Sequence, residues 1–162
     1  MVRNLGEMGL NLQKIVKRLM ANQNLLKLLY YTDKDPLSNP NLTEGQITDE
    51  VYEKLIKIVP RVGPKETANS LISLRVVRGR VDSSNNQIQS ITIHIEVFVP
   101  MTQWFIKDSN LRPFAIMGEV MNSLDNKIIN GLGRIVGGDF GLNFLTDEIS
   151  CYEMEFGIVQ YD

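Results

Sequence analysis

The sequence contains few of the residues that build metal sites and nucleophilic active sites. Its 162 residues include one cysteine, Cys151, and one histidine, His94. A lone cysteine cannot form an internal disulfide, and the common zinc ligand sets need several cysteines and histidines. These counts fit synthesis in a reducing cytoplasm, and we expect neither a cofactor nor a metal site.

Long apolar runs and an excess of basic residues are also missing. Lys27 interrupts the leucines from Leu25 to Leu29, a run far shorter than the roughly 20 residues of a membrane-spanning helix. The first eight residues carry charges and do not resemble a secretory signal. The net charge is −2, whereas proteins that hold nucleic-acid backbones are normally basic. We therefore expect no membrane-spanning segment, and we do not expect that the main task of the protein is to bind nucleic acid.

The remaining composition is that of a globular protein. Hydrophobic residues make up 43% and charged residues 22% of the chain, both close to the averages for folded domains. A domain of this length buries roughly two-thirds of the surface that its unfolded chain exposes. We predict a single domain over residues 1–162.

The N-terminal region predicts one long helix or two short ones. From Leu5 to Tyr31, apolar residues recur at spacings of three and four, as in an amphipathic helix. Residues 22–24 form the expected break, because asparagine favours helix caps. The turn-forming residues that follow predict an irregular loop at about residues 32–47. A loop of this length is either partly mobile or held by contact with something else.

Two further helices are predicted. One begins near Thr48, which can cap it, and runs to about Lys57, with Pro60 and Pro64 beyond its end. The other begins at Pro113, ends at Asn130-Gly131, and carries an apolar residue at every fourth position: Ile116, Val120, Leu124 and Ile128. We expect this last helix to lie on a sheet.

Strand patterns occupy most of the remaining chain. Leu71 to Val81 and Gln87 to Val99 are rich in β-forming residues, and the turn residues 82–86 between them predict a hairpin. Shorter strands are predicted at residues 134–136, 142–145 and 151–161. The grouping predicts an α+β fold, with helices packed on one face of a mainly antiparallel sheet.

Several clusters that could carry chemistry have simpler structural interpretations. The glycines of residues 131–138 follow a helix, whereas phosphate-binding loops follow a strand and open a helix, so we interpret them as a turn. His94 shares a strand face with Glu96, but the local sequence places no nucleophile beside them. Cys151 suits a buried strand position, and the glutamates after it suit a charged edge strand. We therefore predict no catalytic residue and no enzyme.

Three arginines in the first strand of the hairpin are stronger candidates for a functional surface. In a regular strand, Arg78 and Arg80 share one face and Arg75 lies on the other. Such a basic edge could meet an acidic partner or DNA passing nearby. It could equally be a solvated strand face of ordinary surface composition.

One set of residues carries a family resemblance. It comprises the strand Ile91–Pro100, Trp104, Arg112-Pro113-Phe114 opening an amphipathic helix, Gly131-Leu132-Gly133, and the closing strand Tyr152-x-Met154-x-Phe156-x-Ile158. In this order of elements the chain resembles tail-terminator (tail-completion) proteins of tailed bacteriophages and related neck proteins. The N-terminal region is longer than in that family, which leaves an adjacent connector as an alternative.

The resemblance implies a structural virion protein that is assembled in the host cytoplasm. Such a subunit forms a hexameric ring at the head-proximal end of the tail, stops growth of the tail tube and joins the tail to the head. Its implied partners are other copies of the chain, the tail tube and neck or connector proteins, and DNA would pass through the ring without specific binding.

A ring needs contacts that close by rotation, and strand edges and protruding loops can supply them. We therefore expect the loop and the hairpin to contact neighbours through Asp35, Pro36, Asn39, Pro40, Arg75, Arg78, Arg80, Ser84 and Asn85. One alternative is another head–tail connector, neck or tail-associated subunit. A different class is a small enzyme or ligand-binding domain with a pocket between residues 113–130 and the sheet.

Overall fold

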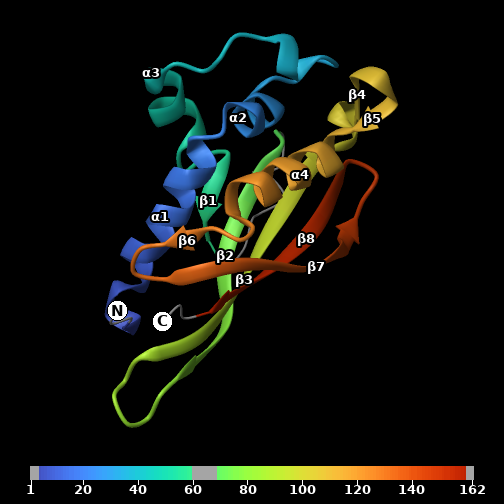
Figure 1. Cartoon of the computed structure of the whole chain (residues 1–162). Helices are drawn as coiled ribbons and strands as arrows, with labels where there is room; N and C mark the ends of the chain where they lie inside the picture. The colour runs from blue at the N-terminus through green and yellow to red at the C-terminus, as the bar shows by residue number, and fades with distance from the viewer. Residues whose placement is uncertain (1–3, 60–68, 160–162) are drawn as a thin grey trace.

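The computed structural model describes residues 4–59 and 69–159, which form a six-stranded sheet with helices on one face (Figure 1). Its strands are β1 (Ile56–Ile58), β2 (Leu71–Val81), β3 (Ile88–Pro100), β6 (Ile128–Ile129), β7 (Gly133–Leu145) and β8 (Ile149–Val159). They lie in the order β1-β2-β3-β8-β7-β6. β1 is parallel to β2, and all other neighbours are antiparallel. The predicted α+β class is confirmed.

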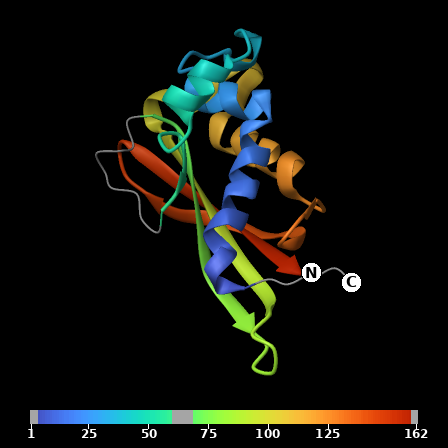
Figure 2. The same cartoon turned by 90° about the vertical axis from the view of Figure 1, so that its left-hand side faces the viewer.

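Three helices cover one face of this sheet (Figures 1 and 2), namely α1 (Met8–Met20), α2 (Gln23–Tyr30) and α4 (Arg112–Leu124). Asn22 lies between α1 and α2 and accepts a hydrogen bond from the backbone N–H of Leu25, so the predicted break is confirmed. The apolar faces of the helices pack over alternate residues of β3, and Ile93, Ile95 and Val97 are fully buried there.

Short elements connect the helices and the sheet. Within residues 4–59 and 69–159, the turns of 3-10 helix are η1 (Leu5–Glu7), η2 (Pro36–Ser38), η5 (Met101–Gln103) and η6 (Lys107–Ser109). β4 (Phe105–Ile106) and β5 (Asn110–Leu111) pair as a separate two-stranded sheet beside the start of α4. Together with the loop after α2, they form the end of the molecule opposite the β2–β3 hairpin (Figure 1).

The helix after the irregular loop begins earlier than predicted. It consists of α3 (Glu44–Gln46) and a turn of π-helix, η3 (Ile47–Val51), so Thr48 lies inside it. The reason is a capping box, in which the side chains of Thr43 and Gln46 bond each other's backbone N–H groups.

The same helix also ends earlier than predicted. The expected end at Lys57 is wrong, because the chain turns at Glu53, whose φ is 61°, and residues 56–58 form β1. The sequence pattern did not predict this strand. Pro60 and Pro64, which were expected beyond the helix end, lie outside the described residues.

α4 ends at Leu124, six residues before the predicted end. Asp125 has an extended backbone and Asn126 has a φ of 59°, so the chain leaves the helix and enters β6. Ile128, expected on the helical stripe, is therefore a strand residue and is exposed. Gly131 does form a turn, as predicted, and its φ of +89° lies in the region that favours glycine.

Two of the three short strands predicted near the C-terminus are a single strand. β7 contains residues 134–136 and 142–145, but bulges at residues 137–140 and 142–144 interrupt its register with β8. Each bulge adds a residue and breaks the period of two, which explains why the sequence pattern appeared discontinuous. β8 agrees with the predicted last strand over the residues that the structure describes.

Arg112, at the start of α4, is completely buried. Its guanidinium donates to four backbone carbonyls: Nε to Gln103 at 2.9 Å, Nη1 to Leu28 at 2.6 Å and to Tyr31 at 2.8 Å, and Nη2 to Asp33 at 2.7 Å. Leu28 and Tyr31, the two residues bonded by Nη1, lie at the C-terminal end of α2, where backbone carbonyls lack helical partners. Burial lowers the pKa of Arg112, but arginine keeps its charge.

Replacing Arg112 by methionine is expected to lower the free energy of unfolding by about 3 kcal/mol or more. Two buried and two partly buried carbonyls would lose a charged donor, and each unsatisfied buried group costs about 1–3 kcal/mol before relaxation. Urea denaturation followed by circular dichroism measures this change. The matched control is Arg78→Met at an exposed position, which should alter stability by no more than about 0.5 kcal/mol. Equal losses in both variants would contradict the role of Arg112.

Candidate functional site

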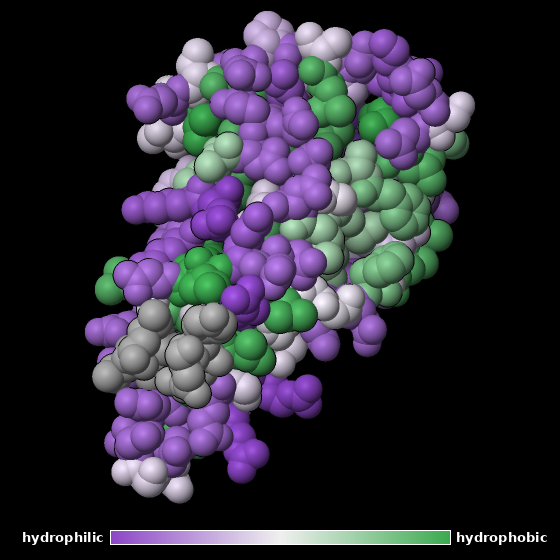
Figure 3. Space-filling view, in the orientation of Figure 1, coloured by the Kyte–Doolittle hydropathy of each residue, from purple (hydrophilic) through white to green (hydrophobic). Residues whose placement is uncertain are grey.

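An apolar strip lies on the surface where α4 meets β7 and β8. Phe140 and Leu142 of β7 are 65% and 54% exposed. Phe114 of α4 lies 5.2 Å from Tyr152, measured between ring centroids, and Leu142 is opposite Tyr152 in the sheet. In Figure 3 hydrophobic colour gathers over this region. We define the apolar strip as Trp104, Phe114, Met117, Phe140, Leu142 and Tyr152.

A shallow groove of about 310 Å³ runs along this strip between α4 and β7. Its walls are mainly apolar, and Asp139 and Glu155 are the charged residues among those that line it. The two elements lie close together at Gly137, where an added Cβ would be 2.7 Å from the Cε at the end of the flexible Met121 side chain. A ligand pocket was one alternative for this place in the sequence. Catalytic and ligand sites usually combine a concave apolar surface with several convergent polar groups.

β7 is also a free edge of the sheet over much of its length. β6 pairs only with Gly133 and Arg134, so no strand in the described chain pairs with the outer side of residues 138–145. The first bulge, at residues 137–140, lies at the start of this segment, and the second, at residues 142–144, lies inside it. Proteins commonly use bulges and charged side chains to prevent unspecific pairing of an edge strand. The exposed aromatic and leucine side chains of β7 have the opposite effect, because they favour contact with another protein.

The helix-free face of the sheet carries a ladder of charged side chains. Arg75 pairs with Glu96 and, at 2.9 Å, with Glu153. His94 Nδ1 lies 2.7 Å from Glu153, and His94 Nε2 lies 3.1 Å from Glu155. His94 and Glu96 do share a face, as predicted, but the histidine contacts the two carboxylates of β8. These pairs join β2, β3 and β8 across the sheet.

Cys151 is buried beneath this ladder, and its Sγ lies 3.3 Å from the carboxylate of Glu96. Burial raises the pKa of the Cys151 thiol to about 12. At neutral pH the group is therefore a protonated thiol, whereas nucleophilic cysteines are thiolates with lowered pKa values. The arrangement fits the structural interpretation of Cys151.

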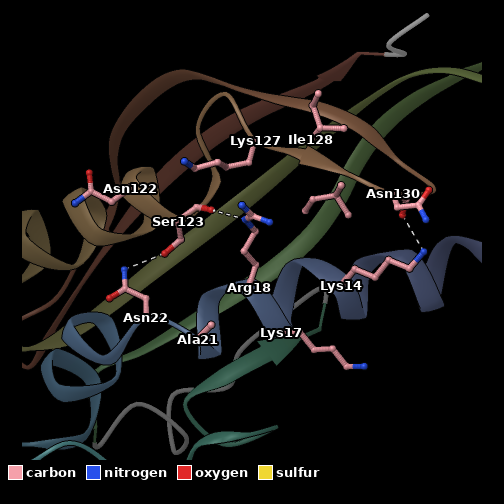
Figure 4. A pocket seen from close by; sticks show the side chains of 11 residues that line it. Lys14, Lys17, Arg18, Ala21, Asn22, Asn122, Ser123, Lys127, Ile128 and Asn130 are labelled. Atoms are coloured by element: carbon pink, nitrogen blue, oxygen red, sulfur yellow. Dashed lines mark hydrogen bonds between the residues drawn. The ribbon is translucent and has the colours of Figure 1, made fainter.

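A second groove, of about 650 Å³, is lined by basic residues of α1 and the segment after α4 (Figure 4). Lys14 donates to the carbonyl of Asn130 at 2.8 Å, and Arg18 Nε donates to the carbonyl of Ser123 at 3.1 Å. These bonds tie α1 to the end of α4 and to the β6–β7 turn. Lys17 and Lys127 add two more positive charges to this groove, so its charge is complementary to that of a negatively charged partner.

The predicted loop residues lie together at one end of the molecule, and the loop bonds to its own chain. Asn39 Nδ2 donates to Asp33 at 2.9 Å, and Tyr31 donates to the carbonyl of Pro40 at 2.8 Å. Pro36 is buried, and Asp35 lies 3.4 Å from Lys107. These bonds hold the loop against its own chain, and contact of the loop with a neighbouring subunit stays a prediction.

The predicted hairpin residues lie at the opposite end (Figure 1). Ser84 donates twice to Asp82, from its N–H at 2.9 Å and its hydroxyl at 2.7 Å, and these bonds lower the pKa of Asp82. Asn85 accepts from the N–H of Gln87. These contacts shape an exposed turn. The structure therefore does not bring the loop and hairpin candidates together into one site.

The expectation that Arg75 lies on a different face from Arg78 and Arg80 is wrong. They are paired with His94, Thr92 and Ser90, alternate residues on one face of β3. Val77 is an extra residue in β2, and this bulge reverses the alternation after it. All three arginines consequently share the helix-free face.

Sequence reasoning missed the apolar strip. Residues 142–145 were predicted as a short strand without any statement about which side chains are exposed, and glycines and Asp139 precede them. That combination of an apolar run with nearby turn residues was the available signal for an exposed edge. No helix in residues 4–59 or 69–159 is long and apolar enough to span a membrane, and no group of potential metal ligands is found in those ranges.

The fold and surfaces define a small α+β protein with a curled sheet, a free strand edge and an adjoining apolar strip. Residues 22–154 match the model of the YomW family, and the chain belongs to this phage-derived, SPbeta prophage-like family. No curated protein matches the chain. Membership of this family indicates a phage protein, which is the broader part of what the resemblance implied.

Alkylation can test the state of Cys151. At pH 8 the folded chain should react with iodoacetamide about a thousandfold more slowly than in urea, because a rise in pKa from 9.0 to about 12 lowers the thiolate fraction by that factor. Mass spectrometry of the labelled chain measures the rate. A Leu142→Cys variant in a Cys151→Ser background provides an exposed control. Equally fast labelling of folded Cys151 would contradict its burial as a protonated thiol.

Proposed function

We propose that this phage protein is a structural virion subunit, a tail terminator that forms a hexameric ring at the head-proximal end of the tail. The ring would stop growth of the tail tube and provide the surface to which the head joins. The observation that carries this proposal is the apolar strip beside the free edge of β7, where Phe140 and Leu142 are more than half exposed. Exposed apolar patches of this kind commonly mark contacts with other proteins.

The chemistry of the other surfaces supports an assembly role. The charged ladder is internally paired, and Cys151 is a buried thiol rather than an activated nucleophile. The groove beside α4 has mainly apolar walls. In a virion the partners would be further copies of the chain, the tail tube and neck proteins, with DNA passing through the ring without specific recognition.

A neck, connector or other tail-associated subunit is the closest alternative, since it would use the same kind of surface with a different partner. A ligand-binding domain is a second candidate. The specific observation in its favour is the 310 Å³ groove, a volume within the usual range of ligand pockets. Its scarcity of convergent polar groups makes it better suited to an apolar protein surface.

The ring proposal predicts a closed species near six times the chain mass of 18.4 kDa. Native mass spectrometry and light scattering over a range of concentrations measure this mass. If closure needs the tail as a template, the chain should instead bind purified tail tubes at one end and prevent their further growth. A stable dimer or trimer that binds no tail tube would contradict the terminator role. Binding to portal or neck proteins alone would favour the connector.

A further inference from the structure

We propose that two copies of this chain join by strand pairing, with the free edge of β2 from one copy added to the free edge of β7 from the next. The inference rests on the proposed assembly role and identifies the surfaces that would carry it. The two edges lie at opposite sides of the sheet, so the contact is heterologous and repeats from copy to copy.

The second free edge is the distal half of β2. β1 pairs only with Ile72, Ser73 and Leu74, so no described strand pairs with the outer side of residues 75–81. This segment belongs to a hairpin that projects from the body of the molecule (Figures 1 and 2). Unpaired backbone donors and acceptors of an edge strand provide a template for another strand.

The strand directions allow the sheet to continue without turning the neighbour over. β2 is antiparallel to β3, β3 to β8, and β8 to β7, so β2 and β7 run in opposite directions. A neighbour in the same orientation, displaced along the strands so that its residues 75–81 lie beside residues 138–145, therefore presents its β2 antiparallel to β7. Its helices then lie on the same face of the continued sheet as those of the first copy.

The apolar side chains of the two edges match on the helix side. Val76 is opposite Ile93 and Phe140 is opposite Met154, and both partners belong to the face covered by α4. Val76 and Val81 are exposed on the β2 edge, as are Phe140 and Leu142 on the β7 edge. Pairing would bring these side chains together, and cross-strand contacts between aromatic and β-branched residues stabilise sheets.

The charges match on the opposite face. A hollow of about 210 Å³ beside β7 is lined by Asp139, Glu153 and Glu155, and we call it the acidic notch. Gly141, opposite Glu153, leaves the notch open from the edge. The β2 edge carries Arg78 and Arg80 on this same helix-free face. Glu153 and Glu155 already contact Arg75 and His94 within the chain, and an arginine from the neighbour would join this network from the open side of the notch while the two strands pair.

Complementary variants test the contact directly. The β2-edge variant is Arg78→Glu with Arg80→Glu, and the β7-edge variant is Phe140→Lys with Leu142→Lys. Lysines on an edge strand oppose pairing, and at these two positions they would place charges against the exposed valines of the neighbour's β2 edge on the helix side. Each variant alone should be monomeric by native mass spectrometry at a concentration at which the wild-type chain associates. An equimolar mixture should form a heterodimer, because one intact β2 edge and one intact β7 edge remain.

Two controls have matched chemistry at other surfaces. Leu10→Lys changes a leucine of α1 that is 70% exposed, and Lys17→Glu with Lys127→Glu reverses two charges in the basic groove. Both should associate like the wild type. Circular dichroism should give the same spectrum for all variants, since every substituted side chain is exposed.

The outcomes separate this inference from the terminator proposal. Persistent oligomers of either edge variant, or a mixture that stays monomeric, would overturn the pairing while leaving a ring through other surfaces possible. Edge-dependent association without tail-tube binding would support the pairing and overturn the terminator role. A wild-type chain that remains monomeric up to roughly 1 mM, a concentration that detects a dissociation constant of that order, would overturn self-pairing.

Discussion

The guanidinium of Arg112 is a positive charge removed from water, and several segments are arranged to satisfy it. Its donors bond the end of α2, the loop that follows and the turn η5, while its own backbone starts α4. Burying a charge is costly unless its hydrogen bonds are complete. Because segments distant in sequence must converge to complete them, this contact fixes α4 relative to α2. The position of α4 on the sheet in turn places Phe114 beside β8 and creates the apolar strip.

The sequence was informative where one periodicity dominates. The alternating apolar residues of β3, the turn at residues 82–86 and the break at Asn22 all specify local structure, and the sheet with helices on one face follows from their order. It was less informative where a single residue changes the period. Val77 reverses the faces of β2, Asn126 ends α4, and the bulges of β7 divide one strand into apparent fragments. Such positions depend on pairing with distant strands, which a local pattern does not contain.

The candidate surface was harder to predict than the fold for a related reason. An apolar residue in a strand usually indicates the core, and only the sheet order reveals that Phe140 and Leu142 lie on an outer strand. The arginines of β2 were recognised from composition alone, but their common face depends on the bulge at Val77. Whether a strand residue is exposed, and on which face of the sheet it lies, thus depends on the assembled sheet and not on the local sequence alone.

The bulge at Val77 also makes the length of β2 matter more than the identity of its exposed residues. A single substitution in the projecting hairpin changes one side chain, whereas loss of one residue before Arg78 moves every later side chain of that strand to the other face. Guanidinium groups would then point toward the helix layer and valines toward the charged layer. An insertion or deletion in this short segment would therefore exchange the charged and the apolar faces of the projecting hairpin. The number of residues between Arg75 and Arg78 decides which face carries the arginines.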